Sequence, residues 1–319
     1  EAHCVSQWGY EFRPDYLKLK TIRDQLGHPP CLALTATADH RLRADIIEKL
    51  GITSCRQHVY SVDRSNIALS VEKVLGQLQK QERMKALVQK LQGPGIIYFS
   101  SRDATEAASQ YLQQYTSVSV SYYHAGMTNE ERRLIQSQFL NDELDVVCCT
   151  NAFGMGVNKP NIRYVLHYHY PKHINAYLQE IGRAGRDGSQ SLAILLYTEE
   201  DHDLPLYLID HEFPSQQQIT HVLAKWRVDQ QIDIERVGLE CGCSETAARF
   251  LKEQFEKFHF DQKDVDIMNA LDTRISSRKR LHLSELQRFK NWITSKECRR
   301  IGILRMFDES HQERKHYPC

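Results

Sequence analysis

The stretch Leu144-Asp-Val-Val-Cys-Cys-Thr-Asn-Ala-Phe-Gly-Met-Gly-Val-Asn-Lys-Pro160 joins a short apolar run to a loop that contains two glycines. Such a run is typical of a strand buried on both faces of a sheet. Further apolar runs at 96–99, 164–168 and 192–197 alternate with helix-like segments. Alternation at this spacing predicts a parallel sheet with right-handed crossovers and helices on both faces, which is an α/β fold.

The segments between these runs carry helix-start signals. Capping boxes at Asp103–Glu106 and Thr128–Glu131 predict two helices, with a further strand at 118–122 between them. The first helix is expected to bury an apolar face of Ala107, Tyr111 and Tyr115. Ligands of open parallel sheets bind where the strands end, so we expect chemistry in the loops after Phe99, Cys149 and Tyr168.

Related but smaller patterns flank this region. Before it, Cys31–Leu34 reads as a strand, Asp39 as the cap of a helix that reaches Leu50, and 60–66 as a joint. After Pro205, the helical periods at 219–230, 234–240 and 244–258 are typical of either a helix-turn-helix or a plain helical packing unit. We therefore expect four parts, at 1–62, 63–204, 205–297 and 298–319.

Composition excludes several classes of protein. No apolar run of the 319 residues is long enough to span a membrane, and the nine scattered cysteines indicate a reducing compartment rather than a secreted disulfide framework. Lys plus Arg equals Asp plus Glu at 41 each, so any nucleic-acid surface must be local. A local basic stretch is made of Arg274, Arg278, Lys279, Arg280, Arg288, Lys290, Lys296, Arg299, Arg300 and Arg305. It is either a solvated helix face or a DNA contact.

The most specific string is Gln179-Glu-Ile-Gly-Arg-Ala-Gly-Arg-Asp-Gly188. Arg183 and Arg186 are three residues apart, so one helical turn would point both guanidiniums the same way. The glycines at 182, 185 and 188 are expected to clear space for a phosphate chain or a facing domain. Two arginines placed in this way suit stabilisation of a transferring phosphoryl group.

These strings, with Glu1-Ala-His3, Thr35-Ala-Thr37 and Ile96-Ile-Tyr-Phe-Ser100, resemble the successive motifs of superfamily 2 helicases. Glu1-Ala-His3 resembles a DEAH box without its leading Asp. The continuation Cys4-Val-Ser-Gln-Trp-Gly-Tyr-Glu-Phe-Arg-Pro14 resembles the aromatic-rich loop of RecQ-family DNA helicases. The resemblance implies RecA-like parallel-sheet domains followed by a mainly helical accessory and zinc-binding region.

The resemblance also implies roles for individual residues. The catalytic set would be Glu1, His3, Gln179, Arg183 and Arg186, with Arg186 as the arginine finger. The DNA-binding set would be Ser6, Gln7, Trp8, Phe12, Arg13, Ser100, Arg102, His124 and Thr150, since aromatics interleaved with Arg suit stacked bases and phosphates. Thr35 and Thr37 would couple the two sets. Cys298 and Cys319 resemble the first two ligands of a structural Zn²⁺ site, which needs four, and the basic stretch beside them would grip duplex DNA.

The implied function is an ATP- and Mg²⁺-dependent 3′-to-5′ DNA helicase in repair and recombination. Its partners would be single-stranded and forked DNA and a single-stranded-DNA-binding protein, in the bacterial nucleoid or in a nucleus. No Gly-Lys pair occurs in the chain, so we expect the P-loop that the family carries upstream to be missing. A non-catalytic DNA-binding or strand-annealing fragment is therefore the alternative, and an RNA helicase is a third reading. His169 stands where many relatives carry a carboxylate.

Overall fold

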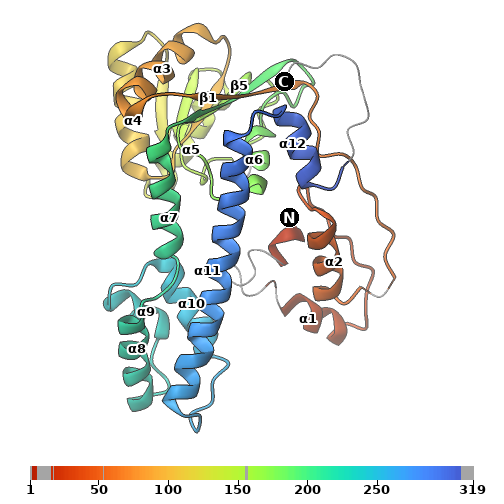
Figure 1. Ribbon diagram of the computed structural model, residues 1–319, viewed down its shortest axis with the longest axis vertical. Helices are drawn as coiled ribbons and strands as arrows, with labels where there is room; N and C mark the ends of the chain where they lie inside the picture. The colour runs from red at the N-terminus through yellow and green to blue at the C-terminus, as the bar shows by residue number, and fades with distance from the viewer. Residues whose placement is uncertain (1, 6–15, 17, 53, 155–156, 310–319) are drawn as a thin grey trace. The chain divides into compact units, whose positions relative to one another are not determined.

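The computed structural model describes residues 2–5, 16, 18–52, 54–154 and 157–309. It divides into two compact units. The sheet unit contains Ser61–Pro205 and Glu285–Cys319, and the helical unit contains Glu1–Tyr60 and Leu206–Ser284. Two helices, α7 (Asp203–Asp210) and α11 (Asp264–Thr294), run from one unit into the other (Figure 1). Within the described residues, no helix combines the length and apolar character that crossing a bilayer requires.

The sheet unit is built on six parallel strands in the order β1-β6-β5-β2-β4-β3. The strands are β1 (Ile67–Lys73), β2 (Gly95–Tyr98), β3 (Val120–Tyr123), β4 (Val146–Cys149), β5 (Tyr164–His167) and β6 (Ser191–Tyr197). Every residue of β2, β4 and β5 is buried, which explains why these central strands are continuous apolar runs. The predicted parallel sheet with helices on both faces is confirmed.

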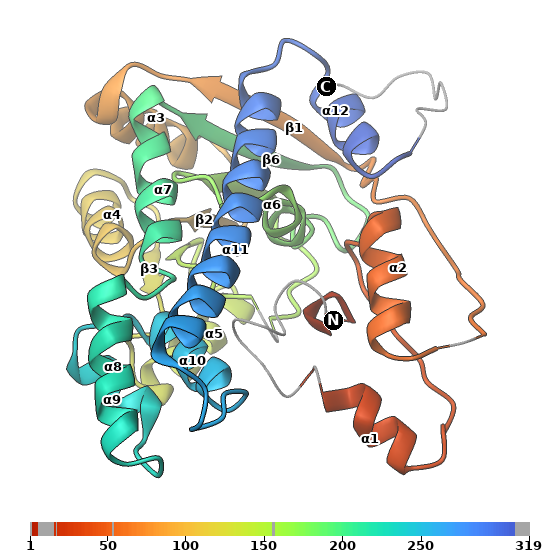
Figure 2. The ribbon, with the colours of Figure 1, turned by 60° about the horizontal axis from the view of Figure 1, so that its bottom comes forward.

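Helices cover both faces of this sheet (Figures 1 and 2). α3 (Gly76–Lys90) and α4 (Arg102–Tyr115) bury Met84, Leu87 and Leu112 against one face. α5 (Asn129–Leu140) and α6 (Ile174–Ile181) cover the other face, where the ring of Tyr177 lies 4.9 Å from the ring of His167 on β5. The end strand β1 was not predicted, because Ile67–Lys73 is only half apolar. Helix α3 was not predicted either.

The predicted start and face of α4 were wrong. Its N-cap is Ser101, whose Oγ accepts from Ala104 N at 3.3 Å, so Asp103 lies inside the first turn. Its buried side chains are Thr105, Ala108, Ser109 and Leu112, while Ala107 and Tyr115 are exposed. The predicted box at Thr128–Glu131 is confirmed at the start of α5, with both reciprocal hydrogen bonds present.

A buried ion pair ties α3 to the segment after β6. Lys80 Nζ lies 2.6 Å from Asp201 Oδ2, and both side chains are almost fully buried. Asp201 belongs to η3 (Glu199–His202), and its Oδ2 also accepts from Thr198 N at 2.8 Å. Burial lowers the pKa of Lys80, and its partner Asp201 opposes that shift. Taking one partner away would leave an uncompensated charge in the interior.

The C-terminal helices of the sheet unit pack on α6 through aromatic rings. Tyr177 lies 5.4 Å from Phe289 and 5.2 Å from Trp292, both on the last turns of α11. Trp292 Nε1 donates to Arg299 O at 2.9 Å, at the start of α12 (Arg299–Met306). These contacts place the last turns of α11 against α6 and join them to the start of α12.

Helices of residues 206–284 form their own core. α8 (Gln216–Val228), α9 (Ile234–Glu240) and α10 (Glu245–Phe255) were predicted, and Ser244 caps α10 as expected. Buried residues from all three pack with Ile267 and Leu271 of α11, which was not predicted as a single long helix. The choice between a helix-turn-helix and a packing unit stays open.

Residues 2–52 contain η1 (Ala2–Val5), α1 (Leu19–Gln25) and α2 (His40–Lys49). Asp39 caps α2 as predicted, since its Oδ1 accepts from Leu42 N at 2.8 Å. The predicted strand at Cys31–Leu34 was wrong. Leu32 is 82% exposed, and no neighbouring strand pairs with 31–34 within the described residues, where a parallel strand would need one.

Candidate functional site

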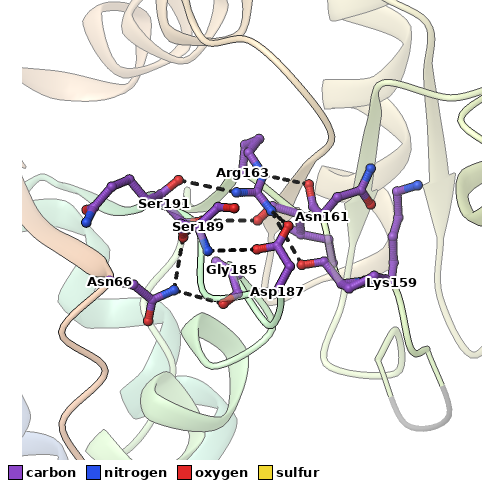
Figure 3. Close-up of polar contacts among 12 residues, drawn as sticks. Asn66, Lys159, Asn161, Arg163, Gly185, Asp187, Ser189 and Ser191 are labelled. Carbon is purple, nitrogen blue, oxygen red and sulfur yellow. Dashed lines mark hydrogen bonds and ion pairs between the residues drawn. The ribbon is translucent and has the colours of Figure 1, made fainter.

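The segment Gly182–Ser189, called the arginine segment below, is held by polar contacts with Asn66 and Arg163 (Figure 3). Gly185 N donates to Ile162 O at 2.9 Å, just before β5. Asn66, which precedes β1, donates from Nδ2 to Gly185 O at 2.8 Å and to Ser189 O at 3.0 Å. Since β6 follows directly, the segment lies at the amino-terminal edge of β1, β5 and β6.

An ion pair fastens the middle of the arginine segment. Arg163 Nη2 lies 2.5 Å from Asp187 Oδ2, and this contact lowers the pKa of Asp187. Arg163 Nε also donates to Asn161 O at 2.8 Å, while Asp187 Oδ1 accepts from Ser189 N at 3.0 Å (Figure 3). These contacts join the exposed end of the arginine segment, residues 186–189, to Arg163.

The expectation that the glycines clear space for a ligand was wrong for Gly185. A Cβ there would lie 2.5 Å from Asn66 Nδ2, so the missing side chain makes room for the chain's own packing. Gly185 also has φ +56°, a left-handed conformation that favours glycine. Gly188 does face open space, because no atom lies within 4 Å of the position that a Cβ would take there.

Arg183 is buried and contacts the glycine loop after β4, and its predicted catalytic role stays a prediction. Its Nη1 donates to Gly154 O at 2.6 Å, in the glycine loop after β4. Gly154 has φ +132°, and a Cβ there would lie 2.0 Å from Arg183 Cζ, so the guanidinium occupies the space that a side chain would take. The contact between Gly154 and Arg183 thus joins the glycine loop to the arginine segment, the two glycine-containing strings found in the sequence.

Arg186 is the exposed arginine of the pair. Its Nη1 donates to Val157 O at 3.1 Å and to Asn158 Oδ1 at 3.3 Å. Partial burial and the cations Arg183 and Arg64 lower the pKa of Arg186, so an approaching anion would relieve that repulsion. The expectation that one helical turn aligns both arginines was wrong, because α6 ends at Ile181 and a turn follows.

A buried pair that the sequence did not reveal joins β5 to α6, the helix that precedes the arginine segment in the chain. His167 Nε2 and Glu180 Oε2 are 2.7 Å apart, and both side chains are buried. The His167 ring stacks on Tyr98 at 5.3 Å, and Tyr98 Oη donates to Phe153 O at 3.3 Å. Gln179 lies half-buried beside Glu180 on α6. Nothing in the string itself indicates that the Glu180 carboxylate is buried, and only the crossing of α6 over β5 shows its partner.

The predicted DNA-binding residues of the sheet unit gather at the opposite, carboxyl-terminal edge. Ser100, Thr150 and His124 follow β2, β4 and β3, which are neighbours in the sheet. Ser100 N donates to His169 Nδ1 at 3.2 Å, and Thr150 Oγ1 accepts from Ala152 N at 3.4 Å. Ser100 and Thr150 are both half-buried.

His124 is buried, and exposed Arg102 lies beside it. His124 Nε2 is 2.8 Å from Glu106 Oε1, and its Nδ1 accepts from Gly126 N at 3.2 Å. A Cβ on Gly126 would lie 3.2 Å from Arg102 Nη1, so the glycine lets the guanidinium approach. The Glu106 carboxylate therefore binds the His124 ring and is not part of a capping box.

His169 holds the start of this edge in place. Its Nδ1 must be unprotonated to accept from Ser100 N, and burial together with the charge of Lys80 lowers the pKa of His169 to about 4. A neutral ring at physiological pH agrees with that acceptor role. No acidic group occupies this position.

In residues 2–52, the two helicase-like strings meet. His3 Nδ1 lies 2.9 Å from Thr35 Oγ1, and Thr37 N donates to the same oxygen at 3.4 Å. His3 and Thr37 are buried. Ala2 N also donates to Leu34 O at 2.7 Å, so the two segments are in register.

Other predicted site residues fall outside the described residues. These are Glu1, Ser6, Gln7, Trp8, Phe12, Arg13 and Cys319. Cys298 lies at the N-cap of α12. Among the described parts of the chain, no three His, Cys, Asp or Glu residues form a group that could hold a metal ion. The proposed zinc ligands therefore stay a prediction.

The basic stretch is partly committed to internal contacts. Lys279 Nζ lies 2.6 Å from Asp210 Oδ1, and Arg288 Nη2 donates to Met306 O at 2.7 Å. Arg300 is buried among backbone carbonyl oxygens. A DNA grip by this stretch would thus depend on its remaining, exposed members.

Comparisons with known proteins find similarity to helicases. The family model described as "Helicase conserved C-terminal domain" matches residues 79–188, which include the glycine loop and all of the arginine segment except Ser189. The probable ATP-dependent DNA helicase RecS of Bacillus subtilis (strain 168) is 41% identical over 323 residues, covering 100% of this chain and 64% of that protein. The ATP-dependent DNA helicase RecQ of Pasteurella multocida (strain Pm70) is 41% identical over 206 residues, covering 63% of this chain and 32% of that protein.

Among solved structures, S. cerevisiae Dbp5 bound to RNA and ADP BeF3 is similar with a TM-score of 0.51 and 18% identity, covering 65% of this chain and 54% of that one. At this identity the likeness shows the fold alone, which is RecA-like. The chain spans less than two thirds of the length of each of these relatives. The helicase family model and the similarity to RecS along the whole of this chain together support a fragment of a RecQ-family helicase.

Proposed function

We propose that this chain works within an ATP-dependent DNA helicase and that Arg186 is its arginine finger. The observation that carries the proposal is that the two arginines differ in burial. Arg183 is buried against Gly154 O, whereas Arg186 is exposed on a segment that is fixed in advance. A guanidinium held in this way can meet the charge that develops on a γ-phosphoryl group without reorganising first.

The two edges of the sheet would bind different ligands. The amino-terminal edge carries Arg186, and the carboxyl-terminal edge carries Ser100, Arg102 and Thr150. ATP, held by a facing domain with Mg²⁺, would supply the energy of hydrolysis. The chain's own residues would orient the phosphate chain from one edge and hold backbone phosphates of a single strand at the other.

Finer features of the proposal rest on the family resemblance. They are 3′-to-5′ polarity, a role in repair and recombination, forked DNA as substrate, and a single-stranded-DNA-binding protein as partner. The similarity to RecS and RecQ proteins, which are named DNA helicases, favours DNA over RNA as the substrate. The place of action would be the nucleoid or the nucleus.

The test compares Arg186→Ala with Arg133→Ala, a control at an exposed position on α5. ATP hydrolysis and single-stranded DNA affinity are measured on the intact protein at one salt concentration, because DNA affinity depends strongly on salt. Arg186→Ala should lower DNA-stimulated kcat by about 10³-fold or more, while the DNA Kd stays within about threefold of wild type.

Two results would contradict the proposal. An equal loss of hydrolysis and DNA affinity in Arg186→Ala would make Arg186 a DNA contact or a structural residue. DNA binding by the wild-type protein with no hydrolysis under any condition would support the non-catalytic DNA-binding or strand-annealing alternative. Arg133→Ala is expected to behave as wild type in both assays.

A further inference from the structure

The segment Ser61–Ile67 leads into β1, and the C-terminal helix α12 holds it through Arg300. Arg300 is 6% exposed. Its Nη1 forms an ion pair with Asp63 and donates to Arg64 O at 3.2 Å, and its Nη2 donates to Ile67 O at 2.7 Å. One rigid guanidinium therefore fixes three points of this segment.

A second contact from the C-terminal region fastens the start of the same segment. Glu309 Oε1 accepts from Val62 N at 2.9 Å, and its other carboxylate oxygen accepts from the hydroxyl of Ser61. More than 230 positions separate Arg300 from Asp63 in sequence. The segment is thus clamped along its length by residues 300–309 rather than by its neighbours in the chain.

The clamped segment in turn holds the arginine segment. Arg64 donates from Nη1 to Gly182 O at 3.2 Å, and from Nη2 to Ala184 O at 3.1 Å and Gly185 O at 2.9 Å. These carbonyl groups follow the C-terminus of α6, where unpaired carbonyl oxygens and the helix dipole attract a cation. The turn that presents Arg186 is therefore shaped by Arg64.

We propose that Arg300 is a positioning residue for Arg186, acting through the backbone at residues 63–67 and the side chain of Arg64. This inference rests on the proposed function, because it assigns Arg300 to the hydrolysis step. Residues 298–309 would then set the geometry of the ATP-facing arginine, in addition to any contact they make with DNA. Arg300 itself touches neither ligand.

The chemistry of the contact explains why an arginine is needed. Arg300 serves three acceptors on different residues with a planar fork, which a lysine cannot reproduce with one ammonium group. The paired charge of Asp63 offsets the desolvation of the guanidinium. Loss of the fork would free the Arg64 backbone to shift, and the direct Arg64 bonds to residues 182–185 would shift with it.

The test uses Arg300→Met, which keeps an unbranched apolar stem, and Arg300→Lys, which keeps the charge. Arg133→Met on α5 is the control for loss of an arginine. The first measurement is amide hydrogen exchange of peptides that cover 182–189, compared with peptides that cover β2 and β4, in the intact protein. Both Arg300 variants should speed exchange at 182–189 by about tenfold or more and leave the two strands within about twofold.

The second measurement is steady-state ATP hydrolysis with saturating single-stranded DNA, at a temperature where every variant is folded. Arg300→Met should lower kcat by about tenfold or more, with the KM for ATP and the Kd for DNA within about threefold. The double variant Arg186→Ala with Arg300→Met should hydrolyse ATP at the rate of Arg186→Ala alone, because the two changes act on one interaction.

The outcomes separate this inference from the proposed function. Unchanged exchange at 182–189 in Arg300→Met would overturn the inference whatever the hydrolysis rate. Faster exchange with a normal kcat would also overturn it, since Arg300 would then have only a structural role. A wild-type protein that hydrolyses no ATP would refute the proposed function, and the positioning of the arginine segment would be judged by exchange alone.

Discussion

Gly154→Ala gives the sharpest test of the link between the glycine loop and the arginine segment. The new Cβ would lie 2.0 Å from Arg183 Cζ and 2.4 Å from its Nε, far inside van der Waals contact. The guanidinium must therefore leave its place. The substituted residue would also sit at φ +132°, which is strained for any residue with a side chain.

The expected loss of stability can be worked from these terms. Backbone strain at such a φ costs roughly 1–3 kcal/mol. Displacing Arg183 breaks a buried bond of 2.6 Å from a charged donor to Gly154 O, and such bonds contribute about 1.5–3 kcal/mol. Together these predict a loss of about 3–5 kcal/mol, because relaxation around the methyl group recovers part of the sum.

Gly188→Ala is the matched control, since it carries the strain without the clash. Gly188 has φ +83°, and a methyl group there would meet open space. Its cost should be only the strain, about 1–2 kcal/mol. A comparison of the two variants therefore isolates the contact with Arg183.

The assay is urea unfolding by linear extrapolation. The chain has three tryptophans, and replacing Trp8 and Trp226 by Phe in every variant leaves Trp292 of the sheet unit as the fluorescent reporter. Gly154→Ala should lose at least about 2 kcal/mol more than Gly188→Ala. Equal losses in the two variants would refute the inference that the contact between Gly154 and the Arg183 guanidinium stabilises the fold.

Two further predictions concern buried charge. Lys80→Met should lower the free energy of unfolding by about 3–5 kcal/mol, because Asp201 would keep its charge in the interior. The control Lys73→Met breaks the exposed ion pair with Glu199 and should lower the free energy of unfolding by less than about 1 kcal/mol. Equal losses of the two variants in urea unfolding would contradict this prediction. His169 has a pKa of about 4 in place of 6.5, so the folded state binds fewer protons than the unfolded state between these values. Stability should then fall by up to about 1.4 kcal/mol per pH unit as pH drops from 6.5 to 4, and His169→Gln should remove most of that slope.

The sequence predicted the central strands because burial on both faces leaves an unambiguous pattern. Runs at 96–99, 144–149 and 164–168 contain mostly apolar residues, and all three form strands of the sheet interior. The end strand β1 has only one well-covered face, and its Ile-Ala-Leu-Ser-Val-Glu-Lys sequence is too mixed for the same argument. The order of the strands follows from tertiary packing and has no local signal.

Predictions from local sequence were also wrong where a residue or strand distant in the sequence determines the structure. Glu106 has the spacing of a capping box, yet its carboxylate binds His124 instead. Cys31–Leu34 has the composition of a strand, but composition supplies no neighbouring strand to pair with. The long helix α11 was not predicted as one helix, because its buried residues belong to two separate cores: Ile267 and Leu271 pack in one unit, and Phe289 and Trp292 pack in the other.

The candidate site shows the same division between chemistry and geometry. The residue types and spacing of Gln179–Gly188 identified the chemistry, since paired arginines among glycines suit a phosphate chain. They could not show that one arginine is buried, because the acceptor for Arg183 lies 29 positions away at Gly154. Arg64 was not singled out in the sequence, and Arg300 was named only as a member of the basic stretch, where nothing indicated that it pairs with Asp63 and with backbone carbonyl groups.

The position of the glycine loop suggests how the two edges of the sheet communicate. Thr150 follows β4 at the carboxyl-terminal edge, and the same loop reaches Asn158 beside Arg186. Between them, Gly154 is bonded to Arg183, so displacement of the loop at one end must either move Arg183 or break a buried bond. If DNA binds at Thr150 as proposed above, a shift of the loop as far as Gly154 would therefore move Arg183 or break its bond to Gly154 O. In this view Arg64 and, through residues 63–67, Arg300 hold the backbone of the arginine segment, and the loop contacts Arg186 through Val157 O and Asn158.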